Sequence, residues 1–136
     1  MQPDAARRAD THAWLRKADG DLRAAAVDLA ADPPLVDDAL FHCQQAVEKA
    51  LKGLLTWHDV PFRKTHSLEE LGRQIVALHG DLQNLVDRVS LLSEYAWKFR
   101  YPGEVDSPAL AEAEGALALA REAHATVVAV IGDRLL

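Results

Sequence analysis

Six side chains of this sequence have the charge or the aromatic character to hold an anionic ligand. Lys49 and Lys52 are three positions apart, so that on a helix they share one face. His66 directly precedes a predicted helix N-terminus, where free backbone N–H groups and the helix dipole favour negative charge. The candidate nucleotide- or anion-binding site consists of Lys49, Lys52, Lys64, His66, Arg100 and Tyr101. In such a site the cations would hold a phosphate and Tyr101 would offer a face to a base.

The charge distribution favours a discrete anionic ligand over nucleic acid. The chain carries a net charge of −6, which argues against duplex DNA as a partner. Residues 49–66 nevertheless contain four Lys or Arg and one Asp, a local excess of positive charge. A competing interpretation keeps these groups structural: Glu48 pairs with Lys52 on the helix, and His66 only makes hydrogen bonds in a loop that closes the fold.

A second group of residues points to a covered polar surface. Phe41 lies among polar residues on the side of its helix opposite the apolar arc, and a large aromatic is unusual on a solvated face. We therefore expect a second subunit, another helix or a ligand to cover part of this face. The residues predicted for a dimer or partner interface are Phe41, Gln44, Gln45 and Glu48.

Five helical segments are needed to position these residues. Apolar spacing and terminators predict helices over residues 10–31, 36–57, 67–79, 82–99 and 107–131. Ser67 and Glu70 form a capping box at the third, and Ser107-Pro108 predicts the start of the fifth. No segment alternates with period two. The expected fold is all-α, an up-and-down bundle of about five helices forming one domain over residues 1–136, with its core within about 11–132.

The second helix should be central, with one broad apolar arc in the core. At 100° per residue this arc gathers the following side chains: Ala39, Leu40, Cys43, Ala46, Val47, Ala50, Leu51, Leu54 and Leu55. Cys43, the one cysteine, is thus predicted to be a buried thiol rather than a nucleophile.

Several function classes find no support in the sequence. The six histidines form no i,i+4 pair and have no cysteine partner, so we expect no metal site and no cofactor. Phosphate-binding glycine loops and nucleophile elbows are absent from the sequence. No apolar run approaches 18 residues, and the first ten residues lack a signal-peptide core, so we expect no membrane association and a cytoplasmic location.

Three blocks of sequence together resemble one family. The blocks are FHCQQAVEKALKGLL (41–55), KTHSLEEL (64–71) and RYP (100–102), and Trp14 and Asp21-Leu22 precede them. On these residues the chain resembles the HEPN domain over about residues 11–130. The resemblance implies a bundle of about five helices and frequent homodimerisation. It also implies a minimal nucleotidyltransferase as partner, in a toxin–antitoxin-like or nucleotide-transfer pair.

Many HEPN proteins are metal-independent ribonucleases that use an Arg followed, after four to six intervening residues, by a His. This chain departs from that pattern, because no His follows Arg100 within six positions. Arg73 and His79 have the spacing but lie in the third predicted helix, and Arg7 and His12 have it near the N-terminus. We therefore expect no catalytic residues in the usual place.

Three functions remain open on the sequence. The preferred one is a non-catalytic HEPN binding module that partners a nucleotidyltransferase and binds a nucleotide. The second is a HEPN ribonuclease toxin with a divergent active site. The third is a purely structural dimerisation domain.

Overall fold

The computed structural model describes residues 4–103 and 107–132, and its elements are helices. The α-helices are α1 (Ala5–Ala30), α2 (Val36–Trp57), α3 (Leu68–Leu78), α4 (Gln83–Val89) and α5 (Leu110–Ile131). Two 3₁₀ segments, η1 (Gly80–Leu82) and η2 (Ser90–Ala96), flank α4. The all-α class is confirmed. None of the described helices is long and apolar enough to cross a membrane.

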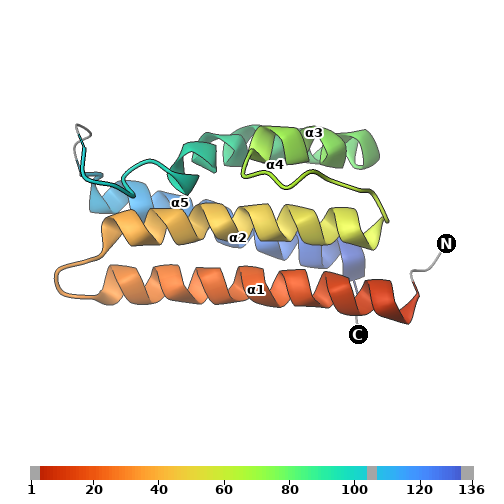
Figure 1. The fold of residues 1–136 in the computed structure, drawn as a ribbon, viewed down its shortest axis with the longest axis horizontal. Helices are drawn as coiled ribbons and strands as arrows, with labels where there is room; N and C mark the ends of the chain where they lie inside the picture. The colour runs from red at the N-terminus through yellow and green to blue at the C-terminus, as the bar shows by residue number, and fades with distance from the viewer. Residues whose placement is uncertain (1–3, 104–106, 133–136) are drawn as a thin grey trace.

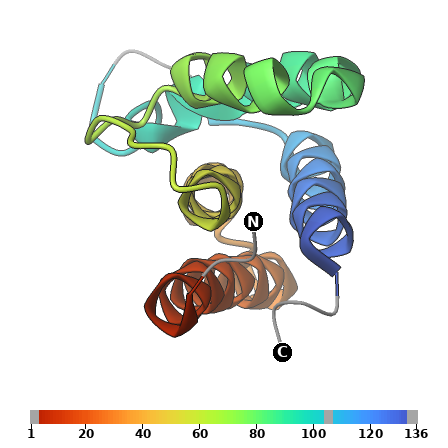
Figure 2. The same cartoon turned by 90° about the vertical axis from the view of Figure 1, so that its right-hand side faces the viewer.

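Helix α2 lies at the centre of the bundle. It runs antiparallel to α1, and the end-on view shows α1, α5 and the α3–α4 layer surrounding it (Figures 1 and 2). Every side chain of the predicted apolar arc is buried, and Leu40, Leu54 and Leu55 have no exposed surface. The central placement explains why α2 buries side chains on more than one face.

The helix boundaries follow local capping. The predicted and observed bounds of α2 coincide. Helix α1 begins five residues earlier than expected, because Oδ1 of Asp4 accepts a hydrogen bond from the Arg7 backbone N–H at 2.8 Å. At α3, Oγ of Ser67 accepts from the Glu70 backbone N–H as predicted. The Glu70 carboxylate instead forms an ion pair with Arg63.

Two further boundary predictions were wrong. Residues 82–99 do not form one helix, since the α-helical part ends at Val89 and continues as η2. Val89, Leu92 and Tyr95 are all buried, and this spacing of three matches the three residues per turn of a 3₁₀ helix. Helix α5 starts at Leu110 with Ala109 in the N-cap position, so Ser107 does not cap it.

Candidate functional site

The face of α2 opposite the apolar arc carries a buried polar network. Gln44, Glu48 and Lys52 follow one another at intervals of four and are only 0%, 3% and 6% exposed. The loop between α2 and α3 returns across this face and delivers His66 to it. The expectation that part of this face is covered is therefore confirmed, and the cover comes from the same chain.

Glu48 is the centre of the network. Its Oε1 atom accepts from Gln44 Nε2 at 3.1 Å and lies 2.7 Å from Nδ1 of His66. Its Oε2 atom accepts from Nζ of Lys52 at 3.0 Å. Gln44 Nε2 also donates to the backbone carbonyl of His66 at 3.1 Å. Both oxygens of the buried carboxylate are thereby satisfied, as a buried charge requires.

The protonation of Glu48 follows from these contacts. Burial opposes ionisation of the carboxyl, but the hydrogen bonds from His66, Gln44 and Lys52 and the Lys52 charge outweigh it. The pKa of Glu48 consequently lies below its usual value of 4.5. Near neutral pH this group is a carboxylate that fixes the His66 ring.

Lys52 does not present its ammonium to a ligand, which corrects its place in the predicted anion site. Besides its bond to Glu48, its Nζ lies 5.6 Å from the ring centroid of Trp14 and 5.8 Å from that of Phe62. Two aromatic rings and a carboxylate thus surround the charge. The structural alternative, in which Glu48 pairs with Lys52, is the one observed.

Lys49 and Arg100 are also neutralised within the chain. Lys49 Nζ donates to Oδ2 of Asp21 on α1 at 2.7 Å. Arg100 Nη1 lies 3.4 Å from Oδ1 of Asp38. Asp38 and Lys52 are fourteen positions apart on α2, which separates them by about 21 Å along the helix. The six predicted residues therefore do not converge on one phosphate.

The exposed members of the predicted anion site are Lys64, His66, Arg100 and Tyr101. Arg100 pairs at the surface with the half-exposed Asp38, whereas Lys64 forms no ion pair with a described residue. Tyr101 lies on the loop after η2 and is 81% exposed. His66 differs from the other three because the buried Glu48 holds its Nδ1 side while the ring remains open to solvent.

The predicted interface residues fall into two groups. Gln44 and Glu48 are buried inside the single chain, so a second subunit cannot contact their side chains. Phe41 and Gln45 are partly exposed. The guanidinium carbon of Arg100 lies 3.8 Å from the centroid of the Phe41 ring, which is a cation–π contact. The cover that the sequence predicted for Phe41 is thus provided at least in part by Arg100.

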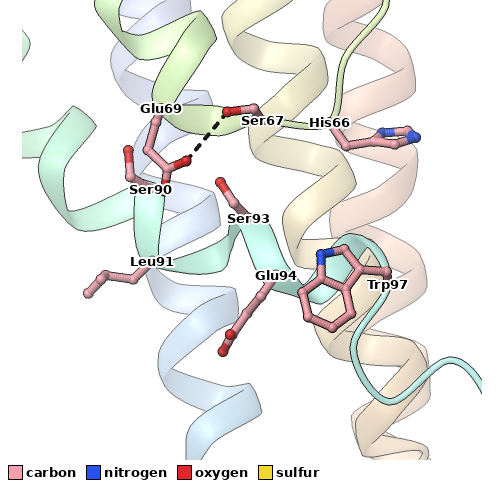
Figure 3. A pocket seen from close by; sticks show the side chains of 8 residues that line it. All are labelled: His66, Ser67, Glu69, Ser90, Leu91, Ser93, Glu94 and Trp97. Carbon is pink, nitrogen blue, oxygen red and sulfur yellow. Dashed lines mark hydrogen bonds between the residues drawn. The ribbon is translucent and has the colours of Figure 1, made fainter.

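A pocket of about 550 Å³ opens beside His66, between the start of α3 and η2 (Figure 3). Its lining residues are His66, Ser67, Glu69, Ser90, Leu91, Ser93, Glu94 and Trp97. Two carboxylates and a single histidine make this lining unsuited to phosphate. Ser93 anchors one wall, since its Oγ accepts from the Leu68 backbone N–H at 3.0 Å.

The sequence patterns did not single out the exposed apolar residues at this pocket. Leu91 is 75% exposed and Trp97 is 65% exposed, and they lie near the two ends of the 90–97 segment (Figure 3). The missed signal was the three-residue spacing of Val89, Leu92 and Tyr95. This spacing fits the 3₁₀ geometry observed, but it also occurs along an α-helix, so by itself it does not separate the two.

Of the two Arg–His pairs with ribonuclease-like spacing, Arg73 and His79 lie at α3, and the described contact of His79 is not with Arg73. Arg73 is exposed on α3, while His79 follows the end of that helix. Nε2 of His79 lies 2.8 Å from Nε2 of His58, so the partner found for this ring is a second histidine.

Comparisons with known proteins place the chain at the family level. Residues 11–130 match the family model described as the HEPN domain. No curated protein and no solved structure matched the chain.

Proposed function

The chain belongs to the HEPN domain family, and we propose that it is a non-catalytic binding module that partners a minimal nucleotidyltransferase in a toxin–antitoxin-like pair. The partner class comes from the family. The observation that carries the binding role is the exposure of three large side chains within one short segment, Leu91, Trp97 and Tyr101, here called the 91–101 surface.

Large apolar side chains that are mostly exposed to water are available for contact with a partner. Leu91, Trp97 and Tyr101 are 75%, 65% and 81% exposed, and they flank the pocket beside His66 or follow it in the chain. Exposed Trp and Tyr are enriched at protein interfaces, where they act as anchors. Glu69 and Glu94 at the same pocket supply a polar rim, in which Glu94 is paired with Lys98 and Glu69 adds a negative charge.

Nucleotide binding is a narrower part of this proposal. Because Lys49, Lys52 and Arg100 are paired with Asp21, Glu48 and Asp38, a phosphate contact rests on Lys64 and on the exposed side of the His66 ring, outside the pocket. The N-terminus of α3 adds little, since two of its N–H groups already donate to serine hydroxyls and its first turn carries Glu69 and Glu70. Exposed charges of this kind bind more weakly as salt is added.

Complex formation with a nucleotidyltransferase encoded next to this chain tests the proposal. We expect the full-length chain to form a complex in isothermal titration calorimetry, and Trp97→Ala to weaken it at least tenfold, because interface Trp residues are typical hot spots. Val27→Ala is the matched control, since Val27 is also 70% exposed but lies on α1. Absence of a complex, or equal effects of the two substitutions, would refute the proposed surface.

The ribonuclease alternative has one observation in its favour. His66 is oriented by a buried carboxylate and lies at a pocket, which is an arrangement that suits a general base. RNA cleavage by the purified chain that is lost in His66→Ala would establish this second function. Cleavage that is lost in Arg73→Ala or His79→Ala would instead assign it to the motif with the family spacing. If neither a complex nor cleavage is found, the structural dimerisation role remains.

A further inference from the structure

Three potential metal ligands meet where α1 and α2 are joined. Asp28 lies in the last turn of α1, and Asp38 and His42 lie one turn apart near the start of α2. One ligand atom from each residue lies within 4.8 Å of the other two. This cluster is separate from the pocket beside His66 and contains none of that pocket's lining residues.

The orientation of His42 leaves one ring nitrogen facing the two carboxylates. Nδ1 lies 2.8 Å from Oδ1 of Asp21, so this nitrogen is the donor when the ring is neutral. Nε2 then carries the lone pair, and it lies 3.3 Å from Oδ2 of Asp38. Lys49 donates to the second oxygen of Asp21 and holds that carboxylate in place. A carboxylate behind a histidine is the usual support of a metal-binding imidazole.

The surroundings of Asp28 are a second, independent indication that a positively charged group belongs in this cluster. The residue is only 8% exposed, and its Oδ2 atom is buried without a hydrogen-bond donor among the described residues. A buried, unpaired carboxylate oxygen is costly. Arg100 does not pair with the Asp28 carboxylate, since its guanidinium contacts Oδ1 of Asp38 instead.

We propose that Asp28, Asp38 and His42 bind a divalent transition-metal ion, with Asp21 as the positioning residue for His42. Two carboxylate oxygens and one imidazole nitrogen form a mixed donor set that suits ions such as Zn²⁺ or Mn²⁺. The ion would compensate the unpaired oxygen of Asp28 and join the end of α1 to the start of α2. The expectation of no metal site rested on His pairs and cysteine and did not consider a set dominated by aspartate.

Titration of the untagged, full-length chain with Zn²⁺ tests this site. Calorimetry should give one ion per chain, and Zn²⁺ should raise the thermal unfolding temperature. Asp28→Asn and His42→Gln should each weaken binding at least tenfold. Asp21→Asn should weaken it by roughly 10–100-fold, the usual effect of removing a supporting partner. Helicity measured by circular dichroism establishes that each variant is folded, and Asp38→Asn, at a half-exposed position, provides a further ligand variant.

Two controls separate this site from other sources of zinc binding. Asp37→Asn removes an exposed carboxylate beside Asp38 and should leave the affinity unchanged. His79→Gln removes one member of the His58–His79 pair, whose ring nitrogens are 2.8 Å apart, and should also leave it unchanged. The proposal is overturned if no Zn²⁺ binds, or if binding survives in folded Asp28→Asn and is lost in His79→Gln. Neither result affects the proposed partner surface, because the two sites share no residue.

Discussion

Nζ of Lys52 lies 3.0 Å from Oε2 of Glu48, and both side chains are buried on the polar face of α2. Because the two charges pair with each other, this polar face of α2 is part of the interior. The pairing also removes Lys52 from the group of cations that a ligand can reach.

Removing the charge of Lys52 should destabilise the fold. We expect Lys52→Met, which keeps the stem but leaves Glu48 without its cation, to lower the free energy of unfolding by about 3–5 kcal/mol. Urea unfolding followed by circular dichroism measures this value. The double variant Glu48→Gln/Lys52→Met should lose much less than the sum of the two single losses. Additive losses would show that the two groups are not coupled.

The contribution of Glu48 should depend on pH in a defined direction. Its pKa in the folded chain is below the usual value of 4.5, so ionisation favours the folded state. The stabilisation is therefore present above about pH 4.5 and is lost as the pH falls through the lower folded-state pKa. The difference in unfolding free energy between wild type and Glu48→Gln should be constant near neutrality and shrink in acid. A difference that grows on acidification contradicts this assignment.

Two glycines should respond in opposite ways to alanine. A Cβ at Gly72 would overlap Cγ1 of Val86, because α3 and α4 approach closely there. We expect Gly72→Ala to destabilise the chain by about 1–3 kcal/mol in thermal or urea unfolding. A Cβ added at Gly115, within α5, would meet no neighbouring heavy atom within 4 Å, so Gly115→Ala should stabilise the chain by roughly 0.5–1 kcal/mol. Equal effects at the two sites would contradict the packing of α3 on α4.

Cys43 should be unreactive in the folded chain. The thiol is fully buried, and burial raises its pKa to about 12, so almost no thiolate forms near neutral pH. Labelling with a disulfide reagent such as DTNB should proceed only as fast as the chain opens and should become rapid in denaturant. Immediate labelling under native conditions would show that the apolar face of α2 is exposed.

A homodimer is expected from the family, and Phe41 and Gln45 are the predicted interface residues that remain partly exposed. Multi-angle light scattering at micromolar concentration should give twice the chain mass of 14.9 kDa. A mass that stays at the monomer value over a hundredfold range of concentration would reject the dimer. Arg100, already in contact with the Phe41 ring, would then be sufficient cover for it.

Local sequence signals were sufficient for the elements with the clearest patterns. The apolar arc of α2 and the proline-containing segments beside it predicted both the bounds and the buried side of that helix. The Ser67 cap of α3 was also predictable, because its hydrogen bond to the Glu70 N–H joins residues three positions apart. Interactions of this range depend little on the rest of the fold.

Residues 82–99 show where local patterns were insufficient. Their apolar content predicted one helix, whereas the chain changes to 3₁₀ geometry at Ser90. Packing of Val89, Leu92 and Tyr95 against the core decides this change, and Ser93 joins the segment to α3 through Leu68. Such contacts link positions far apart in the sequence.

An all-α HEPN fold with α2 at its centre was predictable from the sequence, because helix periodicity and the family motifs involve residues that are close together in the chain. Which charges reach solvent depended instead on how the helices pack. Asp21, Glu48 and Asp38 neutralise Lys49, Lys52 and Arg100, two of these pairs joining residues far apart in the chain. The same packing brought Asp28 of α1 beside Asp38 and His42 of α2. Electrostatic pairing depends on distance in space, and that distance is fixed when the helices pack.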